Sequence, residues 1–134
     1  MPIKTKRVLV IILTIIAIMG VSYAGSINIE PASDAQRSII QAALGSQYPI
    51  SEIAVIKSSN HSRAYYIGAV FYAQGVGNIT GIWIVGGSKV SPNLVFSVDG
   101  DAHQFSGMGK ASETKGPAYM WDPEAKALEK YFNK

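Results

Sequence analysis

The hydrophobic and polar positions divide the chain into one long apolar run and a series of shorter patterned segments. The run covers residues 8–21 and contains a single polar side chain, Thr14. Three cations precede it, and the small-residue pattern Ser22-Tyr23-Ala24 follows it. Cations, an apolar stretch and small residues at a cleavage site, in this order, are typical of a signal peptide. The pattern predicts cleavage after Ala24.

The alternative for the same segment is an uncleaved membrane anchor. The hydrocarbon core of a bilayer is about 30 Å thick and needs roughly 20 residues of helix, whereas residues 8–24 number seventeen. The preceding cations favour the cytoplasmic side. We therefore predict that residues 1–24 are a signal peptide or a membrane anchor and that the rest of the protein is exported. It is then secreted, or tethered to the outer side of the cytoplasmic membrane.

The first patterned segment of the exported part carries the signals of a helix. An extended lead-in ends at Pro31. Ser33 and Gln36 then have the spacing of a capping box. Apolar residues recur at helical spacing up to Gly45, and glycine often ends a helix because it takes a left-handed conformation at low cost. The pattern predicts a helix over residues 34–44.

A second helix is predicted over residues 123–132. Asp122 is a favoured N-cap residue, Pro123 fits the first helical position, and Glu124 suits the positive end of the helix dipole. The preceding segment, residues 99–118, is polar and glycine-rich. We expect at most one helical turn there.

Between the two predicted helices, four segments are rich in β-branched and aromatic residues and are separated by turn residues. They cover residues 51–57, 63–73, 78–85 and 94–98. Pro92 is expected to prevent a strand before residue 93. Tight links join antiparallel neighbours, because parallel neighbours need a long crossover. We predict an α+β fold: a helix, a four-stranded antiparallel meander sheet and a C-terminal helix, with the helices mainly on one face of the sheet.

The charge of the exported part is close to neutral. The chain has twelve Lys and Arg against nine Asp and Glu, but Lys4, Lys6 and Arg7 belong to the first segment. Nine cations then face nine acids. A neutral domain without a basic stripe is a poor candidate for nucleic acid binding, because phosphate contacts supply most of that affinity. Residues 25–134 are enough for a single domain, and without cysteine it has no disulfides.

The two central predicted strands are apolar on both faces, whereas a strand that packs on one face should alternate with polar residues. If helices cover one face, the other presents Tyr66, Tyr72 and Trp83 as an exposed aromatic patch. Such a patch marks a partner surface or the seam of a homodimer. The alternative is that residues 99–118 or the last helix lie over this face.

Asp99, Asp101 and His103 form the only cluster of potential metal ligands in the sequence. A calcium site needs six to eight oxygen ligands and a zinc site three or four ligands, and no further ligand set accompanies the cluster. The alternative is structural: Asp99 begins a turn, and Asp101 caps a short helical turn with Gln104 at capping-box spacing.

No catalytic motif is present. His61 and His103 are the only histidines, there is no cysteine, and no Gly-x-Ser-x-Gly pattern occurs. His61 is expected to be a solvated residue in a polar turn. A small hydrolase would have to use His103 with a carboxylate.

Residues 98–106 read Val-Asp-Gly-Asp-Ala-His-Gln-Phe-Ser and follow a tyrosine-rich strand and a Gly-Ile-Trp strand. In this layout residues 50–106 resemble small exported bacterial proteins of unknown function that carry a Val-Asp-Gly-x-Ala-x-x-Phe-Ser segment. The resemblance implies no catalytic residues. It implies that Ala102 and Phe105 pack a short turn against the sheet.

These features predict a non-catalytic binding or interaction module of the cell envelope or extracellular space. The expected partner is another exported protein or an envelope component. No cofactor is predicted, and membrane contact is expected only through residues 8–24, if they are retained. The alternatives are a carrier of a small ligand or metal, and a small hydrolase that uses His103.

Overall fold

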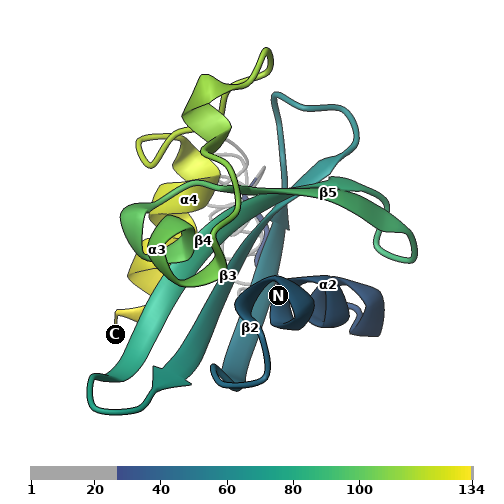
Figure 1. Ribbon diagram of the computed structural model, residues 1–134. Helices are drawn as coiled ribbons and strands as arrows, with labels where there is room; N and C mark the ends of the chain where they lie inside the picture. The colour runs from purple at the N-terminus through teal and green to yellow at the C-terminus, as the bar shows by residue number, and fades with distance from the viewer. Residues whose placement is uncertain (1–26, 134) are drawn as a thin grey trace, which may run out of the picture.

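Short turns connect the last four strands of one antiparallel sheet, whereas a helix separates its first two strands along the chain (Figure 1). The computed structural model describes residues 27–133. The strands are β1 (Glu30–Pro31), β2 (Ile50–Lys57), β3 (Ala64–Ala73), β4 (Gly77–Gly87) and β5 (Pro92–Ser97), and they lie side by side in sequence order. The predicted α+β class and antiparallel sheet are confirmed.

The sheet has five strands rather than the predicted four. The additional strand is β1, in which Glu30 and Pro31 of the extended lead-in pair with Val55 and Ala54 of β2. Pro92 does not delay the last strand but is its first residue. Proline is tolerated at the start of an edge strand, because no neighbouring strand needs its missing N–H group.

The two predicted helices are confirmed as α2 (Asp34–Leu44) and α4 (Pro123–Phe132). At the start of α2, the Gln36 backbone N–H donates to the Ser33 hydroxyl at 3.1 Å. In return, the Ser33 backbone N–H donates to the Gln36 side chain at 3.0 Å. The capping box is therefore formed, and these short-range contacts explain why the sequence located α2 correctly.

Residues 99–118 contain more helix than the single turn expected. They hold α3 (Gly100–Ser106) and a short 3-10 helix, η1 (Ala111–Glu113). The Asp99 side chain accepts a hydrogen bond from the Ala102 backbone N–H at 2.8 Å, and Gly107 ends α3 with a φ of 71°. Asp99, and not Asp101, is therefore the capping residue.

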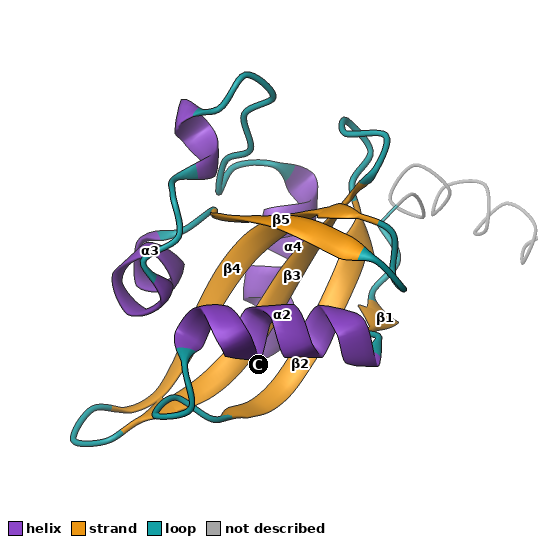
Figure 2. Cartoon of the chain, turned by 45° about the vertical axis from the view of Figure 1, so that its right-hand side comes forward, coloured by secondary structure: helices purple, strands orange, loops and turns teal. Residues whose placement is uncertain are grey.

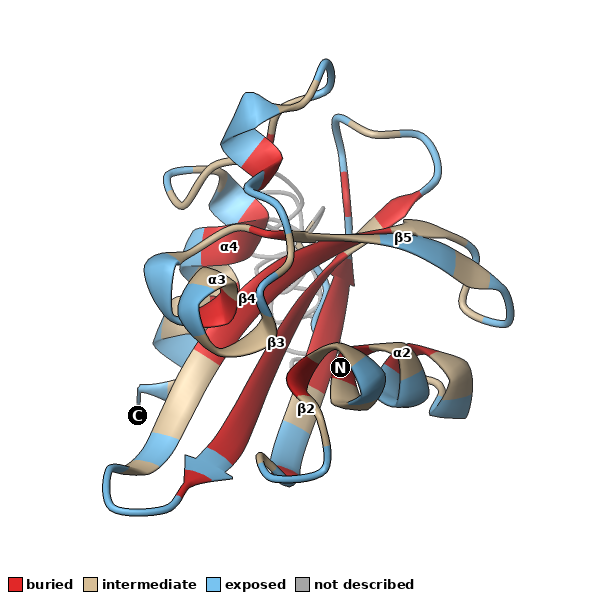
Figure 3. Ribbon diagram, viewed as in Figure 1, coloured by how far each residue is buried: buried red, intermediate tan, exposed pale blue. Residues whose placement is uncertain are grey.

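Helices cover both faces of the sheet, so the prediction that they pack mainly on one face is wrong. In Figure 2, α2 lies in front of the sheet and α4 behind it. The physical reason lies in β3, which is apolar on both faces and is buried along almost its whole length (Figure 3). A strand of this kind needs a cover on each side.

The two resulting cores differ in composition. The α2-side core is rich in aromatic rings, namely Tyr48, Phe71, Trp83 and Phe105. The Phe71 ring centroid lies 5.4 Å from that of Phe105 and 6.3 Å from that of Trp83. The α4-side core is mainly aliphatic and contains Ile56, Tyr66, Ile82, Ile84, Ala125 and Leu128.

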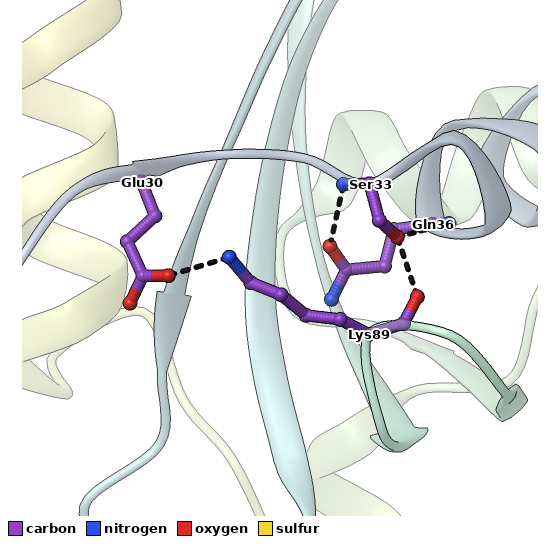
Figure 4. A network of polar contacts seen from close by, with 4 residues as sticks. All are labelled: Glu30, Ser33, Gln36 and Lys89. Carbon is purple, nitrogen blue, oxygen red and sulfur yellow. Dashed lines mark hydrogen bonds and ion pairs between the residues drawn. The ribbon is translucent and has the colours of Figure 1, made fainter.

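A polar network ties the β4–β5 turn to the start of α2 and to β1 (Figure 4). The Ser33 hydroxyl donates to the Lys89 carbonyl, and the Lys89 ammonium pairs with the Glu30 carboxylate. The ion pair is partly exposed and contributes little stability by itself. Gln36 Nε2 is buried and has no hydrogen-bond partner within the described part of the chain.

The predicted signal peptide or anchor lies outside the described residues, so export stays a prediction. Ile27, the first described residue, packs against the α4-side core. Within residues 27–133, no helix has the length and apolar character needed to cross a membrane.

Candidate functional site

The three aromatic residues expected to form one surface do not lie together. Tyr66 and Trp83 are both 0 % exposed. They lie on opposite sides of the sheet, Tyr66 in the α4-side core and Trp83 in the α2-side core. The expected patch is not formed, because α4 covers Tyr66 and Trp83 is buried on the other face, among residues of α2 and α3. Tyr72, near the end of β3, is 48 % exposed and is the one member of the three that a partner can reach.

The three residues of the predicted metal cluster make different contacts. Asp99 caps α3, as described above. His103 Nδ1 donates to the Met108 carbonyl at 2.8 Å, and Asp101 is exposed to solvent. Among the described residues, no group of three His, Cys, Asp or Glu side chains is arranged to hold a metal ion.

Asp99 and Asp101 instead line an open groove of about 530 Å³ between β4, α3 and α4. Glu129 and Phe105 also line this groove. Burial raises the pKa of the Asp99 carboxyl, and the negative charges of Asp101 and Glu129 raise it further. Acidic walls beside an aromatic ring would suit a small organic cation, so the small-ligand alternative would place its ligand here.

Neither histidine is paired with a free nucleophile. His61 Nε2 donates to the Gly116 carbonyl at 2.9 Å, which leaves Nδ1 to accept from the Ser58 hydroxyl at 2.9 Å. The Ser58 oxygen also accepts the backbone N–H groups of Asn60 and His61, and the residue is 6 % exposed. This pair locks the β2–β3 turn, and His61 is not the solvated residue we expected. His103 Nε2 makes no hydrogen bond with the described residues.

An aromatic feature that the sequence did not reveal lies at residues 119–122, called the 119–122 turn below. Trp121 is 71 % exposed. Its ring stacks on that of Tyr119, with centroids 4.2 Å apart and planes inclined by 9°. One face of the indole is therefore covered and the other is open to solvent. The stacking favours this orientation of the exposed ring.

Two hydrogen bonds accepted by the Asp122 carboxylate hold the 119–122 turn in place. Asp122 Oδ2 accepts the Tyr66 hydroxyl at 2.6 Å and the Tyr119 backbone N–H at 2.8 Å. Burial raises the pKa of the Tyr66 phenol, and the bond to the Asp122 carboxylate raises it further. The phenol therefore keeps its proton and remains a donor. Tyr66 positions the turn and does not itself reach the surface.

A second carboxylate, that of Glu124, fixes the start of α4. Glu124 is 1 % exposed, and its Oε2 accepts the Ser59 backbone N–H at 2.6 Å and the Ser59 hydroxyl at 2.9 Å. Its Oε1 is buried and has no hydrogen-bond partner in residues 27–133. A negative charge in the first helical turn is favourable because it faces the positive end of the helix dipole. The β2–β3 turn thereby holds the helix that follows Trp121.

The sequence gives only a weak signal for this site. Tyr119, Met120 and Trp121 interrupt a polar, glycine-rich region directly before an N-cap residue. Met120 packs against the α4-side core whereas Trp121 faces solvent. Three apolar residues without periodicity do not indicate which of them is exposed, and that distinction needs the structure.

No protein-family profile, curated protein or solved structure matches this chain. The resemblance of residues 50–106 to small exported bacterial proteins therefore stays a prediction. Its one structural implication agrees with the fold, because Ala102 and Phe105 pack against the α2-side core.

Proposed function

We propose that this protein is an exported, non-catalytic binding module whose contact surface is the 119–122 turn. The observation that carries the proposal is the exposed Trp121 ring, stacked on Tyr119 and held by buried hydrogen bonds to Asp122. Its partner is an exported protein, a second copy of the chain or another envelope component.

The anchoring distinguishes Trp121 from other exposed apolar residues. Val76 and Val90 are 70 % and 84 % exposed at the tips of the β3–β4 and β4–β5 turns. Single apolar residues of this kind are common on protein surfaces and need no functional explanation. A large ring fixed in one orientation loses little conformational entropy on binding, and tryptophan is enriched where binding energy concentrates.

The surroundings of the histidines also favour binding over catalysis. Ser58 is buried and His61 is partly buried, both are engaged in a turn, and His103 supports the end of α3. A nucleophile must be reachable by its substrate and activated by a neighbouring base. Within the described residues, neither histidine provides that combination.

Photocrosslinking in cells that export the full chain tests the proposal. A benzophenone amino acid replaces Trp121 in one variant and Val90 in a matched control, since both positions are exposed and apolar. The proposal predicts a crosslinked adduct from position 121 and none from position 90. Equal labelling from both positions, or from neither, would contradict it. An adduct of twice the chain mass would identify a homodimer as the partner.

A further inference from the structure

We infer that the partner of the 119–122 turn is the surface of an anionic phospholipid bilayer, and that the domain lies on it with the outer side of α4 towards the headgroups. This inference rests on the proposed function and names the partner for the same surface. It goes beyond the sequence expectation that only residues 8–24 contact the membrane.

The first argument is the place where the chain enters the domain. The apolar segment of residues 8–24 ends three residues before Ile27. Three extended residues span at most about 10 Å. Ile27 packs against the α4-side core, as do Met120 and Phe132. A chain whose apolar segment lies in a bilayer therefore holds the α4 side of the domain, and not the α2 side, next to the membrane.

The second argument is the charge of the exposed residues on the outer side of α4. Lys126 and Lys130 are exposed, and helical geometry places them opposite Ala125 and Leu128, the buried residues of α4. Trp121 directly precedes this helix. Tryptophan and tyrosine favour the membrane–water interface, and lysines close to an anionic membrane surface are attracted to it.

The acidic residues of α4 oppose this attraction only in part. Glu124 is buried. Glu129 is partly exposed and pairs with Lys126 at 3.3 Å. Among the described residues no acid forms an ion pair with Lys130. The exposed Lys126–Glu129 pair can rearrange at low cost, because exposed ion pairs contribute little to stability.

The third argument is the small apolar area around the turn. A stable protein interface buries about 800 Å² on each partner, whereas a tryptophan side chain supplies at most about 250 Å². Trp121 and Tyr131 are the large exposed apolar residues on α4 and the turn before it. The others lie on different elements, namely Ile29, Tyr72, Val76, Val90 and Leu94. A bilayer needs no extended complementary surface, so an exposed aromatic ring directly before a helix with exposed lysines is sufficient.

Quenching of tryptophan fluorescence by brominated lipids tests the inference. The full chain is made by cell-free synthesis into nanodiscs, so that residues 1–24 are retained. The discs contain phosphatidylcholine and phosphatidylglycerol with acyl chains brominated near the headgroup. Trp83 and Trp121 are the only tryptophans, and Trp83 is fully buried, so it serves as an internal reference. We expect quenching in the wild-type chain and its loss in Trp121→Phe. Equal quenching in the two proteins would overturn the inference.

A second variant tests the role of charge. Lys126→Gln combined with Lys130→Gln is expected to reduce quenching, and replacement of phosphatidylglycerol by phosphatidylcholine should reduce it in the wild type. Lys57→Gln with Lys110→Gln is the matched control, because these exposed lysines lie on other elements, and it should leave quenching unchanged. Identical losses in the two double variants would contradict docking through α4.

The outcomes separate this inference from the proposed function. If Trp121 is not quenched in the bilayer but crosslinks to a protein in cells, the lipid inference fails and the binding module stands. If position 121 gives neither quenching nor a crosslink, both fail. A lipid adduct at position 121 together with quenching supports both.

Discussion

The cores on the two faces of the sheet are built differently, although the same strand, β3, contributes residues to both. On the α2 side, Phe71 and Trp83 pack with other rings in a buried aromatic cluster. On the α4 side, Tyr66 is equally buried, but its hydroxyl reaches Asp122 at the edge of the core. The α2 side is therefore closed mainly by packed rings, whereas the α4 side also uses a hydrogen bond that holds the 119–122 turn.

Two strand glycines show how closely aromatic rings pack against each face of the sheet. A Cβ atom at Gly68 would lie 2.7 Å from the Phe132 ring of α4, and one at Gly81 would lie 2.6 Å from the Trp83 ring. These distances are too short for real contacts, so any larger residue would displace the ring. Each face thus uses a glycine in a strand to seat an aromatic side chain.

The largest expected loss of stability comes from a substitution in the α2-side core. Trp83→Ala removes a fully buried ring and its Nε1–H bond to the Ser106 hydroxyl at 3.1 Å. We expect the free energy of unfolding to fall by about 3–5 kcal/mol, as for other large-to-small changes in a core. Urea denaturation measures it. Trp83→Phe keeps part of the ring volume and should cost clearly less. An equal loss from both variants would mean that the hydrogen bond, and not packing, dominates this side.

An intermediate loss of stability is expected from a substitution in the α4-side core. Tyr66→Phe keeps the ring but removes the bond to Asp122, and we expect a loss of about 1–2 kcal/mol. Hydrogen exchange of the backbone amides at residues 119–122 should become faster. Unchanged exchange there would show that the Tyr66 hydroxyl does not hold the turn.

The same substitution changes the response to alkaline pH. The pKa of Tyr66 is raised in the folded protein, whereas the phenol of an unfolded chain loses its proton near pH 10. The folded state therefore binds this proton more tightly, and the stability it contributes is lost as the pH rises above about 10. Tyr66→Phe should lack this part of the alkaline decrease.

The smallest stability effect concerns Asp99, beside the acidic groove. Burial raises the pKa of its carboxyl above the ordinary value of 3.8. The stability contributed by its proton is therefore present at acid pH and is lost as the pH rises from about 4 through the folded pKa. Asp99→Asn keeps the acceptor oxygen for the Ala102 N–H without the charge. We expect the free energy of unfolding of this variant at neutral pH to equal that of the wild type or to exceed it by up to about 1 kcal/mol. Its stability should also depend less on pH. Thermal unfolding over a range of pH measures the stability of the variant and its dependence on pH. A clear loss of stability at neutral pH would show that the Asp99 charge is needed.

Local signals account for what the sequence predicted correctly. Ser33 and Gln36 cap α2 through contacts three residues apart, and Asp122 and Pro123 mark the start of α4. The apolar pattern of β3 indicated that both faces could be buried, but it did not indicate what covers the second face. That depends on the path of the chain from α3 to α4, which no local pattern encodes.

The candidate site was not predictable for a related reason. The bond between Tyr66 and Asp122 joins residues 56 positions apart, and the stacking of Trp121 on Tyr119 follows from the turn that this bond holds. The sequence favoured a surface position for Tyr66 and Trp83, whereas α4 covers Tyr66 and the α2-side core encloses Trp83. The sequence favours Asp101 as the cap because Gln104 stands at capping-box spacing from it, whereas in the fold Asp99 caps α3.

The two tryptophans provide the most direct test of the account, since one is assigned to the α2-side core and the other to the binding surface. Acrylamide quenching of the wild-type chain, Trp83→Phe and Trp121→Phe in solution separates their contributions. The structure predicts strong quenching of Trp121, which remains in Trp83→Phe, and almost none of Trp83, which remains in Trp121→Phe. Equal quenching of the two residues would contradict both the closed α2-side core and the exposed aromatic surface.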